Sequence, residues 1–172
     1  MSNRQGTPDE RLAQARRKLM AAGVGLVVGL VVGTPLLYGM LWLLEIIGLG
    51  VPAREVSVLG QSGMPSLGFT LAVTGLLGMN IGLWLAMKDN PQAKPETRRL
   101  INRWVILLMC TLPITLIYNP QLSYLLSGTV VPEWGRELPL ILARGVLAGA
   151  VFGLAVQYVT ELLLSRLKQR EG

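Results

Sequence analysis

The chain has 172 residues, of which 51% are hydrophobic, and its mean hydropathy is +0.49. Its 16 Lys and Arg residues exceed its 10 Asp and Glu residues, which gives a formal net charge of +6. It has one cysteine and no histidine. This composition excludes an intramolecular disulfide, histidine-ligated zinc, copper or haem, and a Ser-His catalytic dyad.

Four long apolar blocks predict an all-α, polytopic membrane protein. They cover residues 19–49, 64–87, 100–118 and 138–167. A helix needs about 20 mainly apolar residues to cross a hydrocarbon layer about 30 Å thick, and each block comes near or above that length. We therefore expect a four-helix transmembrane domain over residues 19–167, with a helical extension over residues 1–18 before it and a tail over residues 168–172 after it.

The basic residues flank these blocks on one side. Arg4, Arg11, Arg16, Arg17 and Lys18 precede the first block, Lys88, Lys94, Arg98, Arg99 and Arg103 lie around the connection from the second to the third, and Arg166, Lys168 and Arg170 lie at the end of the fourth. The other two connections hold only Arg54 and Arg136. Because Lys and Arg next to spans are retained in the cytoplasm, both termini are predicted to be cytoplasmic. We expect a multi-pass protein of a bacterial-type plasma membrane.

The same placement of charge argues against a nucleic-acid partner. Basic residues beside spans attract anionic lipid and set topology, so the positive charge has an explanation without nucleic acid. The expected partners are the lipid bilayer and another membrane protein or a second copy of this chain.

The amino end carries a helix-start pattern. Thr7-Pro8-Asp9-Glu10 offers an N-cap residue, a proline at the first helical position and a glutamate three residues after the cap. We expect a helix to begin here and to continue into the first apolar block.

The third block is the least regular of the four. Pro113 lacks the N–H that an interior helical position donates, so we expect a kink there. Asn119-Pro120 predicts the end of this helix, because a residue before proline disfavours the helical conformation.

Glycines recur at intervals of four in the first and fourth blocks, in the manner of a glycine zipper. The two rows are Gly25, Gly29 and Gly33, and Gly145, Gly149 and Gly153. Such a row removes side chains from one helix face and lets two backbones approach closely. One interpretation places both rows in contacts within one bundle. The other makes them faces for a homo-oligomer or for docking to a larger partner.

Charged and polar residues inside the blocks are the remaining candidates for a site. Glu45 and Arg144 fall in the same predicted leaflet, where an ion pair would join the first helix to the fourth. A substrate or proton site is the alternative interpretation of these two charges. Asn80 and Gln157 both lie toward the cytoplasmic half, where we expect a hydrogen bond between their helices or a polar cavity.

No pattern in the chain indicates catalysis. All four lysines flank the predicted membrane segments, no glycine-rich phosphate loop precedes a suitable helix, and the carboxylates inside the blocks do not form a close pair. We expect no catalytic residue, no cofactor and no metal site, and thus a protein that is not an enzyme.

Two functions remain. The first is a structural, assembly or accessory subunit that packs through its glycine-rich helix faces. The second is a small oligomeric transporter or channel with a polar pathway near Glu45, Arg144, Asn80 and Gln157. The sparse charge within the blocks, the short connections and the lack of paired discontinuous helices favour the first.

Overall fold

The computed structural model describes residues 8–49, 67–87, 95–117 and 134–170. All of these residues are helical, with no strand among them. In chain order the elements are α1 (Pro8–Val28), the π-helical segment η1 (Gly29–Gly33), α2 (Thr34–Leu44), a second π-helical segment η2 (Glu45–Leu49), α3 (Leu67–Met87), α4 (Pro95–Ile117) and α6 (Trp134–Arg170). The prediction of an all-helical protein is confirmed for this part of the chain.

The first four elements follow one another without a loop and form one long helix that is interrupted at Gly48. It begins at Pro8, and Asp9 and Glu10 lie in its first turn, where carboxylates interact favourably with the positive end of the helix dipole. The predicted cap residue, Thr7, lies outside the described residues. The helix passes from the predicted extension into the predicted first span without a break. Near its end Gly48 has a φ of 77°, a left-handed conformation that glycine adopts without steric cost.

The segment η1 interrupts the α-helical hydrogen bonding in the middle of this long helix. The N–H of Thr34 donates to the C=O of Gly29, five residues earlier. The next residue, Pro35, has no N–H, and in a regular α-helix its ring would clash with the carbonyl four residues before it. A wider turn just ahead of the proline relieves that clash, which explains the position of η1.

Among the described residues, three helices are long and apolar enough to cross a membrane. They are Pro8–Gly48, Leu67–Met87 and Leu142–Gln169. In α4 the stretch whose side chains are described without a gap, Arg103–Thr115, is shorter than a span requires, so α4 stays a predicted fourth span. The α4 helix continues through Pro113 to Ile117, and the predicted stop at Asn119-Pro120 lies outside the described residues.

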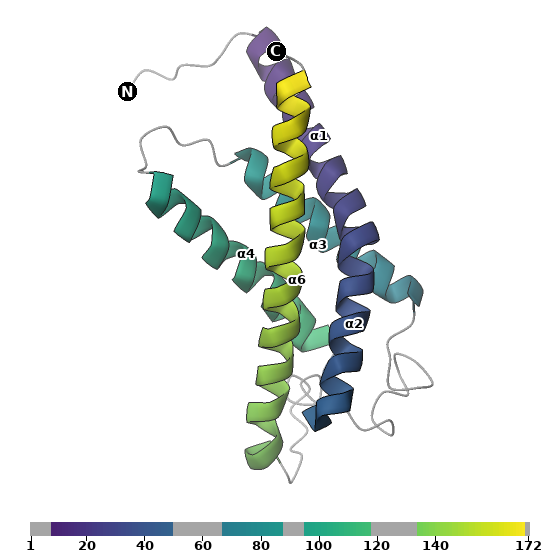
Figure 1. Cartoon of the computed structure of the whole chain (residues 1–172). Coiled ribbons are helices and arrows are strands. Elements are labelled where there is room, and N and C mark those ends of the chain that lie inside the picture. The colour runs from purple at the N-terminus through teal and green to yellow at the C-terminus, as the bar shows by residue number, and fades with distance from the viewer. Residues whose placement is uncertain (1–7, 50–66, 88–94, 118–133, 171–172) are drawn as a thin grey trace.

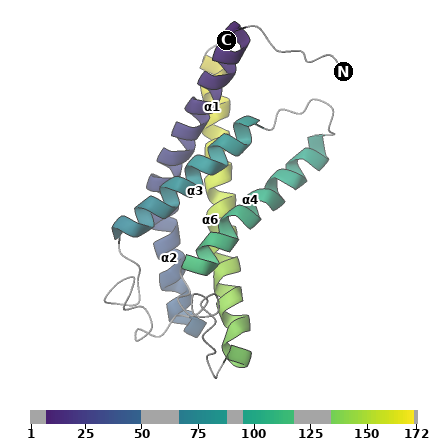
Figure 2. The same ribbon diagram turned by 180° about the vertical axis from the view of Figure 1, so that it is seen from behind.

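The helices are arranged as two crossing pairs. The long first helix and α6 extend along the length of the molecule, while α3 crosses α1 and α4 crosses α6 (Figures 1 and 2). The most extensive contacts join α1 to α3 and α4 to α6, and α6 also contacts α1 and η1. The start of α1 and the end of α6 lie at the same end of the bundle (Figure 1).

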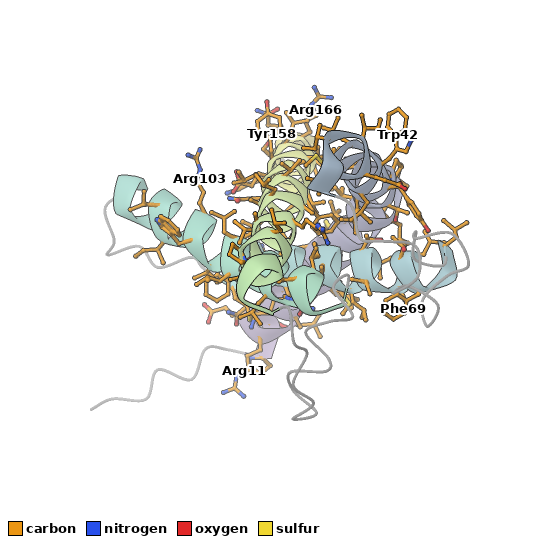
Figure 3. The ribbon with its side chains drawn as sticks, turned by 90° about the horizontal axis from the view of Figure 1, so that it is seen from below. Arg11, Trp42, Phe69, Arg103, Tyr158 and Arg166 are labelled. Atoms are coloured by element: carbon orange, nitrogen blue, oxygen red, sulfur yellow. The ribbon has the colours of Figure 1, made fainter. Side chains whose placement is uncertain are left out.

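The core between these helices is mainly apolar. Leu37, Ile81, Ile106 and Phe152, from four different helices, are fully buried in one cluster. The outer surface also carries large apolar side chains, such as Trp42 and the aromatic Tyr158, which project outward (Figure 3). Apolar residues on both the inside and the outside of a bundle are typical of helices surrounded by lipid.

Candidate functional site

The glycine row of the first helix lies in the crossing with α3. A Cβ atom built on Gly78 would lie 2.8 Å from the Cα of Gly29, closer than real Cβ atoms come to other atoms. A Cβ on Gly25 would meet the backbone of Gly78 and Gly82 in the same way. Two helices therefore touch backbone to backbone here, and any side chain at these glycines would push them apart.

The third member of this row, Gly33, faces α6 instead. A Cβ on Gly33 would lie 3.1 Å from Cζ of Phe152 and 3.2 Å from Cγ2 of Val156. The fully buried ring of Phe152 thus occupies the space that the glycine leaves, which ties α6 to η1.

The glycine row of the fourth predicted span lies against α4. Cβ atoms built on Gly145, Gly149 and Gly153 would meet Thr115, Thr111 and Cys110, respectively. For Gly153 the distance to the Cys110 Sγ would be 3.2 Å, and this cysteine is buried and free. Both rows are therefore covered by neighbouring helices of the same chain, and the two rows do not pack on each other.

A cluster of hydroxyl groups lies next to the first crossing. The Oγ1 atoms of Thr34 and Thr74 are 2.7 Å apart, and Thr74 Oγ1 donates to the C=O of Thr70 at 2.8 Å. Since a hydroxyl has a single hydrogen, Thr34 is then the donor to Thr74. Thr70 Oγ1 donates to the hydroxyl of Tyr38 at 3.4 Å. We call Thr34, Tyr38, Thr70 and Thr74 the hydroxyl cluster.

The hydroxyl cluster joins α2 to α3 at buried positions. Thr70 and Thr74 are fully buried, and Thr34 is 5% exposed. Hydrogen bonds between membrane helices contribute about 0.6 kcal/mol each on average, so the cluster fixes the rotation of the helices more than it stabilises them. The sequence analysis missed these residues. The available signals were the spacing of four between Thr70 and Thr74 and the Thr34-Pro35 pair in the middle of an apolar block.

Asn80 and Gln157 do not bond to each other as predicted. Asn80 Nδ2 donates to the C=O of Leu76 at 2.9 Å, and Gln157 Nε2 donates to Oε1 of Glu161 at 2.8 Å. Each amide thus bonds within its own helix. Asn80 is exposed on α3, whereas Gln157 is 6% exposed inside the bundle.

The buried polar atoms of α6 that have no hydrogen-bond partner among the described residues include two that lie about one turn apart. They are Oε1 of Gln157 and Oγ1 of Thr160. Thr160 is fully buried, three residues after Gln157 and therefore on the same side of the helix.

Glu45 and Arg144 also occupy separate environments. Glu45 is exposed on η2, Arg144 is half-buried on α6, and the described residues contain no ion pair between them. The four residues of the predicted polar pathway are therefore not gathered around one space, because two of them, Glu45 and Asn80, lie on the outer surface.

What the described site offers chemically is helix packing and hydrogen bonding. Within residues 8–49, 67–87, 95–117 and 134–170, no three His, Cys, Asp or Glu side chains come together in a group that could hold a metal ion. Comparisons with protein-family models, with curated proteins and with solved structures found no match to this chain.

Proposed function

We propose that this chain is a non-catalytic, four-span membrane protein with cytoplasmic termini that serves as a structural or accessory subunit of a membrane complex. The proposal rests on the contacts that the helices make inside the bundle. The glycine rows are covered within the chain, and the hydroxyl cluster bonds helix to helix. Because these interior contacts serve helix packing, we place the contact with a partner protein on the outer surface.

The fourth span is supported by the position of α4. Its residues Cys110, Thr111 and Thr115 lie against the glycine row of α6, inside the apolar stretch that α6 contributes as a span. A helix in backbone contact with the middle of a span shares its depth in the bilayer. An even number of spans also agrees with the start of α1 and the end of α6 lying at one end of the bundle.

The alternative, a small oligomeric transporter or channel, draws its support from the polar groups within the spans. The exposed positions of Glu45 and Asn80 would then have to line a pathway between chains. We favour the accessory subunit, because Asn80 and Gln157 hydrogen-bond within their own helices and the hydroxyl cluster joins α2 to α3.

Purification from native membranes in a mild detergent tests the proposal. An unlike membrane protein that co-purifies in constant ratio with the tagged full-length chain is the expected result. As a matched control, the same purification is repeated with Gly29→Leu, which should disrupt the fold and lose the partner. A homo-oligomer without an unlike partner would refute the accessory role, and solute flux after reconstitution of that oligomer would establish the alternative.

A further inference from the structure

A groove opens between α1, α3 and α6 at the end of the bundle where the helix α1 starts and α6 ends. Its volume is about 200 Å³. Its apolar wall includes Met20 of α1, Leu85 and Ala86 of α3, and Leu164 of α6. The groove borders the crossing of α1 with α3, because Ala21, which also lines it, faces Gly82 there; no residue of the hydroxyl cluster lines the groove.

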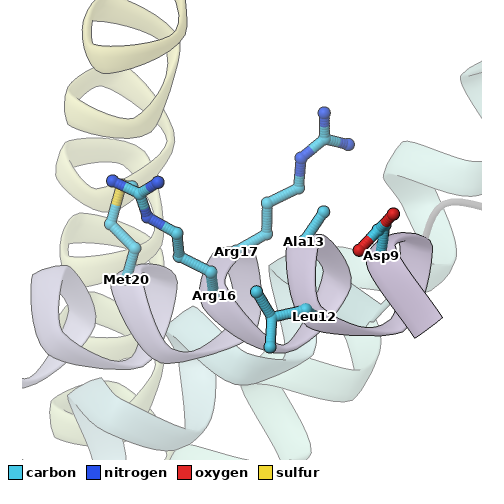
Figure 4. A pocket seen from close by; sticks show the side chains of 6 residues that line it. All are labelled: Asp9, Leu12, Ala13, Arg16, Arg17 and Met20. Carbon is cyan, nitrogen blue, oxygen red and sulfur yellow. The ribbon is translucent and has the colours of Figure 1, made fainter.

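Two cations line the same groove. They are Arg17 of α1 and Lys168 of α6, both exposed, and neither forms an ion pair or hydrogen bond with a described residue. Figure 4 shows the adjoining hollow on α1, which shares Arg17 and Met20 with the groove and in which the guanidinium of Arg17 extends away from the helix. The groove thus combines an apolar wall with two available positive charges.

The acidic side chains near the groove are fewer than the basic ones. Asp9 lines the adjoining hollow, and Glu10 lines a second one together with Arg17. Arg16 belongs to the first of these hollows. Among the described residues that line the groove and these two hollows, three cations, Arg16, Arg17 and Lys168, outnumber the two carboxylates of Asp9 and Glu10.

We propose that this groove binds the headgroup and the upper acyl chain of an anionic phospholipid, an inference that rests on the membrane insertion proposed above. Guanidinium and ammonium groups bind the phosphate, while Met20, Leu85 and Leu164 contact the chain. Basic pockets between helices at the cytoplasmic membrane surface are suited to such lipids. A soluble phosphate would use only the cations, and a zwitterionic lipid would bring a positive charge of its own against them.

Native mass spectrometry of the purified full-length chain tests this site with phosphatidylglycerol and phosphatidylcholine of identical acyl chains. Phosphatidylglycerol should bind more tightly. The Arg17→Gln/Lys168→Gln double variant should weaken its binding by about tenfold or more, because each basic residue near a membrane surface contributes about 1 kcal/mol. Equal binding of the two lipids to the unaltered protein would overturn the proposal.

Two further variants separate a built site from general charge attraction. Arg166→Gln removes a cation from the same end of α6, but this residue is not part of the groove and projects on the side of Tyr158 (Figure 3), so binding should weaken much less than in the double variant. Ala86→Phe fills the groove at constant charge and should weaken binding. An Arg166→Gln effect as large as that of the double variant, or an Ala86→Phe variant that folds and binds normally, would refute the site.

Two controls identify which step has failed. Glycerol phosphate, which has the headgroup chemistry without acyl chains, should not displace the lipid; displacement at equal concentration would exclude the role of the apolar wall. Carbonate extraction of membranes reports insertion independently. Release of the chain by carbonate would refute the proposed membrane protein itself, whereas a retained chain without lipid preference would refute only the lipid site.

Discussion

The hydroxyl of Thr74 both accepts a hydrogen bond from Thr34 and donates one to the backbone of its own helix. Replacing Thr34 or Thr74 by valine keeps the shape and removes this link between α2 and α3. We expect each single change to lower the free energy of unfolding by about 1 kcal/mol, and the double variant to lose less than the sum, with a coupling energy of about 0.5 to 1.5 kcal/mol. The free energy of unfolding in mixed micelles is measured for the unaltered protein, the two single variants and the double variant.

Ser165→Ala serves as the control for this cycle. The hydroxyl of Ser165 is exposed and bonds only to the C=O of Leu162 in its own helix, so its loss should change stability by less than about 0.5 kcal/mol. Strictly additive losses at Thr34 and Thr74 would show that their hydroxyls do not interact.

At the scale of the elements, the crossing of α1 with α3 depends on the absence of side chains. Gly29→Ala or Gly78→Ala places a methyl group against the opposite backbone, and we expect a loss of about 1 to 3 kcal/mol, the usual cost of overpacking. Gly23 and Gly39 have open space around the Cβ position, so alanine there should be neutral or should stabilise by about 0.5 to 1 kcal/mol. Thermal unfolding in detergent compares the four variants.

Gly149→Leu extends the same reasoning to the crossing of α4 with α6, where the added side chain would collide with Thr111. Equal melting of the Gly29, Gly78 and Gly23 variants would contradict the close crossing, since propensity alone acts similarly at all three positions.

The sequence predicts where the helices lie along the chain but not which helices pack together. The length of the apolar blocks predicted the helices, and the glycine spacing predicted faces of close helix packing, because both patterns depend on position along one chain. Which helix covers a row depends on the partner: α3 offers Gly78 and Gly82 to Gly25, while α6 meets threonines and a cysteine on α4. Nothing in the spacing of one helix specifies that choice.

The direction in which a side chain faces around its helix axis was harder to predict than its depth in the membrane. Asn80 and Gln157 were matched by depth in the membrane, yet one faces outward and the other inward. Glu45 and Arg144 were matched in the same way, and Glu45 lies on the exposed side of η2. For Glu45 the missed signal was Pro35. The π-helical turn that precedes this proline rotates every later residue of the first helix relative to α1.

At the scale of the whole molecule, the proposed topology makes a direct prediction. Reporter fusions after Asn90 and at Gly172 should give cytoplasmic signals, and fusions within residues 56–62 and 130–137 should give external ones. The reason is that the basic residues cluster before the first block, around the connection from the second to the third, and at the end of the fourth. Alkaline phosphatase and a fluorescent protein provide complementary readouts. A single reversed signal is incompatible with four spans.

The pairing of α1 with α3 and of α4 with α6 has a consequence for biosynthesis. Each close crossing is complete within one half of the chain, and the halves meet chiefly where α6 contacts α1 and where Phe152 fills the space at Gly33. Two helical hairpins that insert separately and associate later follow the two-stage assembly of membrane proteins. Residues 1–92 and 93–172, expressed together as separate fragments, should therefore reassemble into a complex that co-purifies, and Gly33→Leu should prevent their association while leaving each fragment in the membrane.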